Sequence, residues 1–405
     1  MTRETPPNAR VTSLDVLRGV GILGILAVHI QLFASVGAAR ANPTVYGDLT
    51  GANWWVWLGT DLLAEGKFIS IFAMLFGAGI VVLAARRDAA AADAAGLHYR
   101  RMAGLLVIGL LHAYLLWYGD MLVQFALCGA VVFAYHRLRA RRLVWLGAAV
   151  FCLGAAVPLA IIGSLPWWSA EAAARFSEAW SPSAEVVARE IARYRGGWLE
   201  QMAHRVPAAW EGQTSALAYR LLWQGVGLML IGMGLFKIGV FSAARSTRFY
   251  IAMALGGFGT GVPLLVYTVH RNFAHGWAFE DVSLVGAQLS YFANLAVGLG
   301  WIGVVMLLCR SGWRLAPVAA VGRTALSNYL LQTVICTSIF YGHGLGLFAR
   351  VDRRGQIAMV VAVWAVQLVA SSWWVRRFAV GPVEWAWRSI TYGHRVPLRL
   401  PSAAA

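Results

Sequence analysis

Ten long apolar stretches constrain the fold of this chain more than any other feature of its sequence. A helix that crosses a lipid bilayer needs about 20 mostly apolar residues, and each stretch is close to that length. Only 13% of the 405 residues are charged, whereas soluble domains typically have about 25%. The sequence therefore predicts an all-α fold, a polytopic membrane helix bundle of about ten transmembrane helices that forms a single integral membrane domain over residues 1–405. The stretches are residues 14–36, 62–84, 101–118, 120–136, 143–163, 216–236, 249–269, 284–309, 318–342 and 356–375.

The net charge of +16 comes largely from arginines dispersed in short connections between these stretches. This placement argues against a nucleic-acid interface and is typical of topology determinants, because cytoplasmic loops of membrane proteins are rich in Lys and Arg. With ten helices the basic residues of these connections fall on one side, which predicts that both termini are cytoplasmic. They are Arg3, Arg10, Arg86, Arg87, Arg100, Arg101, Arg137, Arg139, Arg141, Arg142, Lys237, Arg245, Arg248, Arg310, Arg314, Arg376, Arg377 and Arg388.

The cysteines and histidines do not indicate a metal site. Each of the four cysteines lies inside an apolar stretch, no CxxC spacing occurs, and no HExxH motif is present. We therefore expect the cysteines to pack as small apolar residues, without a disulfide framework or structural zinc.

The longest connection, residues 164–215, is predicted to face outward between the fifth and sixth helices. It mixes acidic and basic residues, and residues 183–202 alternate apolar and charged positions in a helical pattern. We expect one or two interfacial helices here. Two roles stay open, a cap over a substrate site and a solvated connector.

The first apolar stretch carries three ionisable residues, Asp15, Arg18 and His29, which are costly in lipid and are therefore functional candidates. Arg18 and His29 are eleven residues apart, so they share one helix face at a rise of roughly 16 Å. Arg18 at the cytoplasmic mouth could hold the phosphates of acetyl-CoA, and the deeper His29 could act as general base or acyl carrier. Alternatively, Asp15 and Arg18 anchor the helix end and His29 hydrogen-bonds a neighbouring helix.

His112 and Asp120 form a second candidate pair, near the outer mouth of the third stretch. A carboxylate that orients a histidine is a common acid/base arrangement. Eight residues and a turn separate the two, however, and Asp120 is equally suited to cap the following helix.

Glu65 and Lys67 lie at the outer start of the second stretch. They could line an outward-facing substrate site, and the alternative is that they anchor the helix at the membrane interface.

A polar stripe runs along the ninth stretch, where Thr324, Asn328 and Gln332 are spaced by four residues. Such a stripe either joins helices or lines a cavity. Its density favours a cavity, with Asn328 and Gln332 binding substrate. Arg323, near the cytoplasmic end, could assist with donor phosphates.

Several of these residues fall within motifs of one family. The chain resembles the YeiB-like bacterial membrane proteins, whose C-terminal half is a domain of unknown function (DUF418), and the resemblance covers nearly the whole sequence. The motifs that carry it are residues 13–19 leading to His29, and residues 67–72, 116–120, 322–332 and 381–388.

The first helix of that family resembles those of two groups of membrane acyltransferases. Type-3 acyltransferases carry an Arg, ten residues and then a His, a spacing that Arg18 and His29 match. The heparan glucosaminide N-acetyltransferase group uses acetyl-CoA and a histidine in the loop after the first helix. Here that loop, residues 31–60, contains no histidine, which leaves His29 or His112 in its place.

These observations lead to one hypothesis and two rivals. The hypothesis is a bacterial inner-membrane acyltransferase that passes an acyl group, most simply acetyl, from cytoplasmic acyl-CoA to a hydroxyl or amine of a glycan, lipid or small molecule. Acyl-CoA would be a co-substrate, and no resident cofactor is expected. Arg18 and Arg323 would hold the donor, with His29, His112 and Asp120 as catalytic candidates. The first rival is a small-molecule transporter that performs no chemistry. The second is a structural or sensory membrane protein whose polar residues only pack helices.

Overall fold

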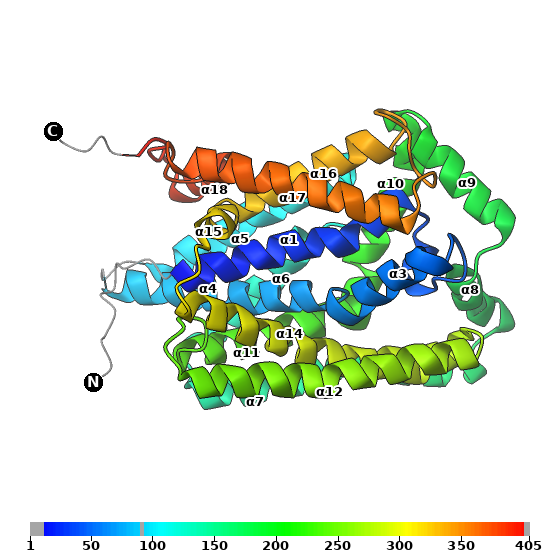
Figure 1. The fold of residues 1–405 in the computed structure, drawn as a ribbon, viewed down its shortest axis with the longest axis horizontal. Coiled ribbons are helices and arrows are strands. Elements are labelled where there is room, and N and C mark those ends of the chain that lie inside the picture. Colours follow the sequence, from blue (N-terminus) through cyan, green and yellow to red (C-terminus); the bar gives the residue numbers. More distant parts are fainter. Residues whose placement is uncertain (1–11, 90–92, 401–405) are drawn as a thin grey trace.

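The computed structural model describes residues 12–89 and 93–400, and in these ranges the chain forms α-helices joined by short turns (Figure 1). Seven helical segments in the described part are long and apolar enough to cross a membrane, and two further apolar helices are shorter. Each of the ten predicted stretches falls on helical residues. The all-α polytopic bundle is therefore confirmed. Two of the basic residues used to assign the topology, Arg3 and Arg10, lie outside the described residues.

The first helix, α1, lies inside the bundle and packs against five other helices. Its tightest neighbour is α15, because glycines let the two backbones touch. A Cβ at Gly322 would lie 1.8 Å from the backbone oxygen of Asp15, and one at Gly19 would lie 2.0 Å from that of Val318. Small residues allow close helix approach in membranes. The helices of this central group are α1 (Thr12–Ala34), α4 (Lys67–Ala89), α14 (Ala287–Arg310), α15 (Ala316–Arg323), α16 (Ala325–Phe340) and α17 (Arg353–Val375).

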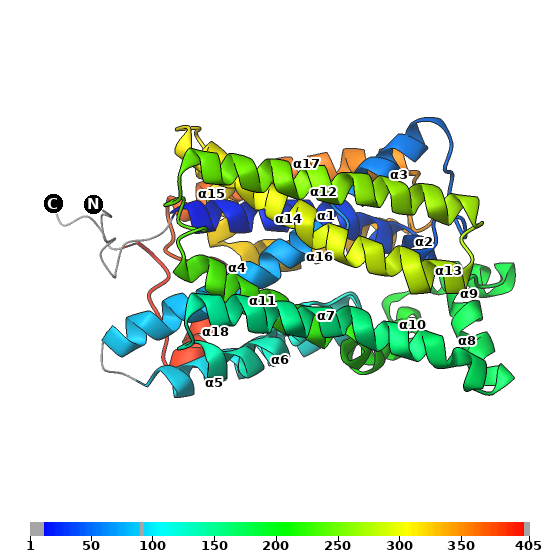
Figure 2. The same ribbon diagram turned by 90° about the horizontal axis from the view of Figure 1, so that it is seen from below.

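The remaining long helices pack around α4 and α14. Helix α11 packs between α7 and α4, and α12 lies along α14 (Figure 2). Many of their exposed side chains are large and apolar, as expected for surfaces that face lipid. These helices are α5 (Ala94–Leu111), α6 (Leu122–Val132), α7 (Ala140–Ser164), α11 (Leu222–Lys237) and α12 (Thr247–Ala274).

Several predicted stretches are interrupted in the structure, two of them at candidate residues. Residues 318–342 form two helices, because Thr324 leaves helical geometry (φ −116°, ψ 36°) between α15 and α16. Residues 101–118 end in a π-helical turn, η1 (His112–Leu116), in which the Trp117 amide donates to the His112 carbonyl at 2.9 Å. Such π-turns are often found at functional sites; the described residues contain two others, η4 (Leu217–Leu221) and η5 (Val282–Gly286).

The two ends of the bundle differ in character. Helix α18 (Pro382–Tyr392) packs against α5 and α16 at the same end of the bundle as the start of α1 (Figure 1). We call this end arginine-rich, and it is the predicted cytoplasmic side. The opposite end, called the outer end, is covered by short helices. The connection over residues 164–215 contains three α-helices, and the second and third of them overlap residues 183–202. The helices at the outer end are α2 (Ala38–Ala41), α3 (Gly51–Leu63), α8 (Ala170–Trp180), α9 (Ala184–Arg195), α10 (Trp198–Gln213) and α13 (Phe279–Asp281).

Candidate functional site

His112 is held from both sides of its imidazole ring. Its Nδ1 lies 2.7 Å from Oδ1 of Asp120, and its Nε2 lies 2.9 Å from the hydroxyl of Thr333 on α16. His112 and Thr333 are 2% and 1% exposed, so the contacts are shielded from solvent. An Nδ1–H that donates to the carboxylate leaves Nε2 free to accept the Thr333 proton. The arrangement is a hydroxyl–imidazole–carboxylate chain, the geometry with which proteins activate a hydroxyl or hold a general base.

Asp120 serves both of the roles that the sequence left open. Its Oδ1 contacts His112, and its Oδ2 accepts the backbone N–H of Val123 at 2.8 Å, in the first turn of α6. The π-turn η1 brings the two side chains together, because it adds a residue to the helix end just before the chain reverses direction. Thr333 was missed by sequence reasoning, although it directly follows Gln332 of the polar stripe.

His29 lies beside the same site, separated from His112 by an aromatic ring. The Trp117 ring is 5.0 Å from the His29 ring and 6.3 Å from the His112 ring, and it stacks on Phe33 at 4.0 Å. Within the described residues the His29 imidazole makes no hydrogen bond, and the buried indole nitrogen of Trp117 also has no hydrogen-bond partner. The site thus contains one clamped histidine and a second one that makes no hydrogen bond within the described residues.

Glu65 and Lys67 have different surroundings. Glu65 pairs with Arg40 at 2.7 Å, at the outer end. Lys67 is fully buried, and its ammonium group donates to the backbone carbonyl of Asp61. Lys67 therefore points into the bundle and does not line an outward-facing surface, whereas Glu65 borders the outer end through its ion pair.

The polar stripe joins helices. The Asn328 amide donates to Ser371 of α17 at 2.9 Å, and the Gln332 amide donates to the Ile22 carbonyl of α1 at 3.1 Å and to Gln367 at 2.9 Å. These donors are occupied by neighbouring helices, which favours the helix-joining alternative over the expected cavity.

Arg18 lies at the arginine-rich end of α1, 3.4 Å from Asp15. Arg101 of α5 is close enough to experience charge repulsion from both Arg18 and Arg388, and its guanidinium covers the Trp387 ring at 4.8 Å. Arg323 follows Gly322, the residue that touches the backbone of Asp15. Helices α1, α5, α15 and α18 thus bring arginines to one end of the bundle, including two that sequence reasoning had assigned only to topology.

The outer insertion covers the histidine site. Tyr194 of α9 belongs to the same buried apolar cluster as Trp117 and Phe33, and its ring stacks on Phe348 at 4.4 Å. Glu190 accepts the backbone N–H of Gly37 at 2.9 Å, and burial raises the pKa of Glu190. These contacts favour the cap over the solvated connector.

The described residues contain no group of three or more His, Cys, Asp or Glu side chains that could hold a metal ion. The polar groups that converge in the bundle are the hydroxyl–imidazole–carboxylate chain, the second histidine and the arginines at one end.

The fold and the buried site define a polytopic helical membrane protein with ionisable groups enclosed between its helices. The chain is 32% identical to the uncharacterized protein YeiB of Escherichia coli (strain K12), over 94% of this chain and 96% of YeiB. It is 30% identical to the uncharacterized protein YxaH of Bacillus subtilis (strain 168), over 96% of each chain. The model of a protein of unknown function (DUF418) matches residues 235–394. The chain belongs to the YeiB-like family.

Proposed function

We propose that this protein is an acyltransferase of the bacterial inner membrane. It would move an acyl group, most simply acetyl, from cytoplasmic acyl-CoA to a hydroxyl or amine of a glycan, lipid or small molecule. The observation that carries the proposal is the buried chain of Thr333, His112 and Asp120, with heavy-atom distances of 2.9 and 2.7 Å. Ionisable side chains inside a membrane bundle are energetically costly, so a buried histidine–carboxylate pair indicates a functional site rather than a packing contact.

In this mechanism His112 is the general base, and Asp120 holds the ring in the tautomer that leaves Nε2 basic. The Thr333 hydroxyl, which passes its own proton to Nε2 of His112, takes the proton from the acceptor hydroxyl or amine, whose oxygen or nitrogen attacks the thioester carbonyl. The bond between the acyl carbon and sulfur breaks, and the proton on His112 passes to the departing thiolate of CoA. His29, on the other side of Trp117, is placed to bind the acceptor or to serve as a second base.

The donor would enter from the arginine-rich end. Arg18 and Arg323 would hold its phosphates, with Arg101 and Arg388 nearby to add positive charge. Arg18 and His29 lie on one face of α1 with a rise of roughly 16 Å between them, so an extended, neutral arm could reach from the phosphates to the histidines.

The transporter alternative loses one of the two features that fit it, the polar stripe, and keeps the other, the long outer connection. It required the polar stripe to line a pathway, but Asn328 and Gln332 donate to α17 and α1.

The first test is binding of acetyl-CoA to detergent-purified protein, followed as a shift in thermal unfolding, with Arg18→Ala in parallel. We expect stabilisation of the wild-type protein and a weaker shift in the variant. Arg189→Ala, which removes an exposed arginine of α9 at the outer end, is the matched control and should behave as wild type. A folded wild-type protein that neither acetyl-CoA nor longer acyl-CoAs stabilise would refute the proposed donor.

A further inference from the structure

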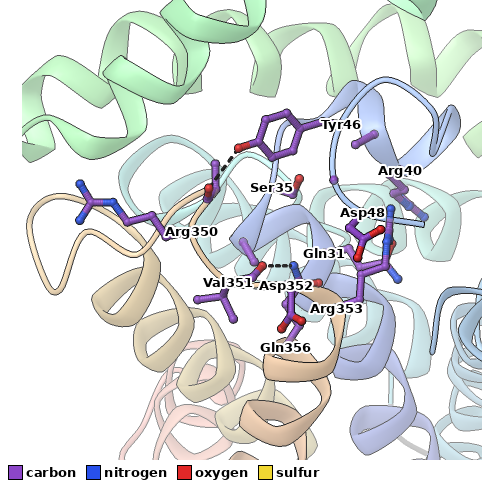
Figure 3. A pocket seen from close by; sticks show the side chains of 14 residues that line it. Gln31, Ser35, Arg40, Tyr46, Asp48, Arg350, Val351, Asp352, Arg353 and Gln356 are labelled. Carbon is purple, nitrogen blue, oxygen red and sulfur yellow. Dashed lines mark hydrogen bonds between the residues drawn. The ribbon is translucent and has the colours of Figure 1, made fainter. Parts of the chain in front are cut away.

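A polar pocket with a volume of about 220 Å³ lies at the outer end, where the end of α1 meets the connection between α16 and α17 (Figure 3). Its walls come from three separate parts of the sequence, and few of the lining side chains are apolar. The polar side chains among them are Gln31, Ser35, Arg40, Tyr46, Asp48, Arg350, Asp352, Arg353 and Gln356.

Arg353 is the residue that identifies what this pocket can bind. It is only 8% exposed, and one terminal nitrogen donates to Oε1 of Gln31 at 3.2 Å. Its Nε is buried and has no hydrogen-bond partner in the described part of the chain. A buried donor of a charged group without an acceptor is energetically unfavourable. A ligand that brings an acceptor to the Arg353 guanidinium would remove this cost.

The carboxylates of the pocket are already engaged elsewhere. Asp48 attracts Arg353 electrostatically, but its oxygens accept from Thr50 at 2.7 and 2.8 Å and from Asn53 at 2.8 Å. Asp352 caps α17 by accepting the Gly355 N–H at 2.9 Å. These hydrogen bonds hold the pKa of both carboxyls below the usual range, so both are ionised at neutral pH without occupying the Arg353 donors.

The pocket lies next to the part of α1 that contains His29. Gln31, two residues after His29 on this helix, lines the pocket together with Arg40, which pairs with Glu65 at 2.7 Å. A ligand in the pocket would therefore lie beside the part of the bundle that contains His29. The pocket is smaller than the 300–1,000 Å³ typical of sites for drug-sized ligands, which suits a molecule of roughly monosaccharide size.

We propose that this pocket binds a small polar molecule or a lipid headgroup through a carboxylate or phosphate presented to Arg353. Guanidinium groups match both anions by forming paired, charge-assisted hydrogen bonds. Under the proposed function this ligand is the acyl acceptor. That assignment rests on the acyltransferase, whereas binding of the anion does not.

The test is isothermal titration calorimetry in dodecyl maltoside micelles, which contain no phosphate. Glucose 6-phosphate and glucuronate are titrated, with glucose as the neutral comparison. We expect saturable binding of at least one of the anionic sugars and none of glucose. Arg353→Gln should weaken binding by about tenfold or more, because losing one hydrogen bond to a charged group raises the dissociation constant by roughly tenfold. Arg189→Gln, an equal charge change on α9 outside the pocket, should leave binding unchanged.

One further variant controls for misfolding, and one further ligand distinguishes a soluble ligand from a lipid headgroup. Arg353→Lys keeps the charge but loses the forked geometry, so it should fold and bind more weakly than wild type. Phosphatidylglycerol added to the micelles will compete with the sugar if the site takes a headgroup, and it will not if the natural ligand is soluble. If neither anionic sugar nor phosphatidylglycerol binds to folded protein, or if folded Arg353→Gln and Arg353→Lys bind as wild type, the proposal is overturned. Acetyl-CoA binding in the same samples reports separately on the donor site at the opposite end.

Discussion

At the scale of single residues, the hydrogen bonds of the His112 ring both stabilise the bundle interior and orient the ring for catalysis. Its two nitrogens contact side chains from different parts of the chain, Asp120 after the η1 turn and Thr333 on α16. Each contact satisfies a buried polar atom, which makes the trio stable in an apolar interior. The same contacts fix the tautomer and the orientation of the ring, as a general base requires.

Asp120→Asn tests the chemical role directly. The variant keeps the shape of the side chain but loses the charge that orients and supports the imidazole, so we expect acyl transfer to fall by about 100-fold or more. The measurement is the initial rate of transfer from radiolabelled acetyl-CoA in proteoliposomes. Asp93→Asn is the matched control, because Asp93 also caps a helix, accepting the Gly96 N–H at 2.8 Å. If both variants lose the same amount of activity, the role of Asp120 is capping alone.

At the scale of elements, a short helix holds the start of a buried one. Glu384 of α18 accepts the backbone N–H groups of Leu326 and Ser327 in the first turn of α16, at 2.7 and 3.2 Å, and also contacts the Ser327 hydroxyl. Helix α16 begins abruptly after the Thr324 break, so its free N–H groups need acceptors from outside the helix. This contact explains why two distant sequence motifs, residues 322–332 and 381–388, occur together.

Glu384→Ala should lower the free energy of unfolding by about 1–3 kcal/mol, because it leaves buried N–H groups without an acceptor. Glu384→Gln should cost less, since its amide oxygen can still accept. Burial raises the pKa of Glu384, which also favours the neutral form that Gln resembles. Thermal unfolding of the purified variants in one detergent measures both. Equal destabilisation by Ala and Gln would show that the negative charge, rather than the acceptor, supports α16.

At the scale of the whole molecule, the outer insertion is attached to the bundle by backbone contacts. Arg205 and the Trp198 indole both donate to the Leu115 carbonyl at 2.9 Å, and that carbonyl lies in the π-turn. Arg195 donates to the Phe348 carbonyl at 2.9 Å. The insertion therefore binds directly to the segment that positions His112, so displacing it should disturb the site.

Gly342→Ala tests this attachment. A Cβ at Gly342 would lie 1.9 Å from the Arg195 backbone oxygen, so α9 must shift. We expect faster proteolysis within residues 164–215 and a lower unfolding temperature. Gly256→Ala on α12 is the matched control, because nothing lies within 4 Å of a Cβ there. Wild-type proteolysis of Gly342→Ala would contradict rigid attachment of the insertion.

The sequence by itself determined the membrane-embedded helical architecture, because length and hydropathy suffice to define a helix that spans lipid. It also indicated His29, His112 and Asp120, since ionisable residues are conspicuous in apolar stretches. Only the tertiary structure decided that Asp120 reaches His112, that Thr333 completes the chain and that the polar stripe joins helices. It alone revealed Arg353 at the outer pocket. The physical reason is that these contacts depend on helix ends and on neighbours from distant parts of the chain, which local periodicity does not specify.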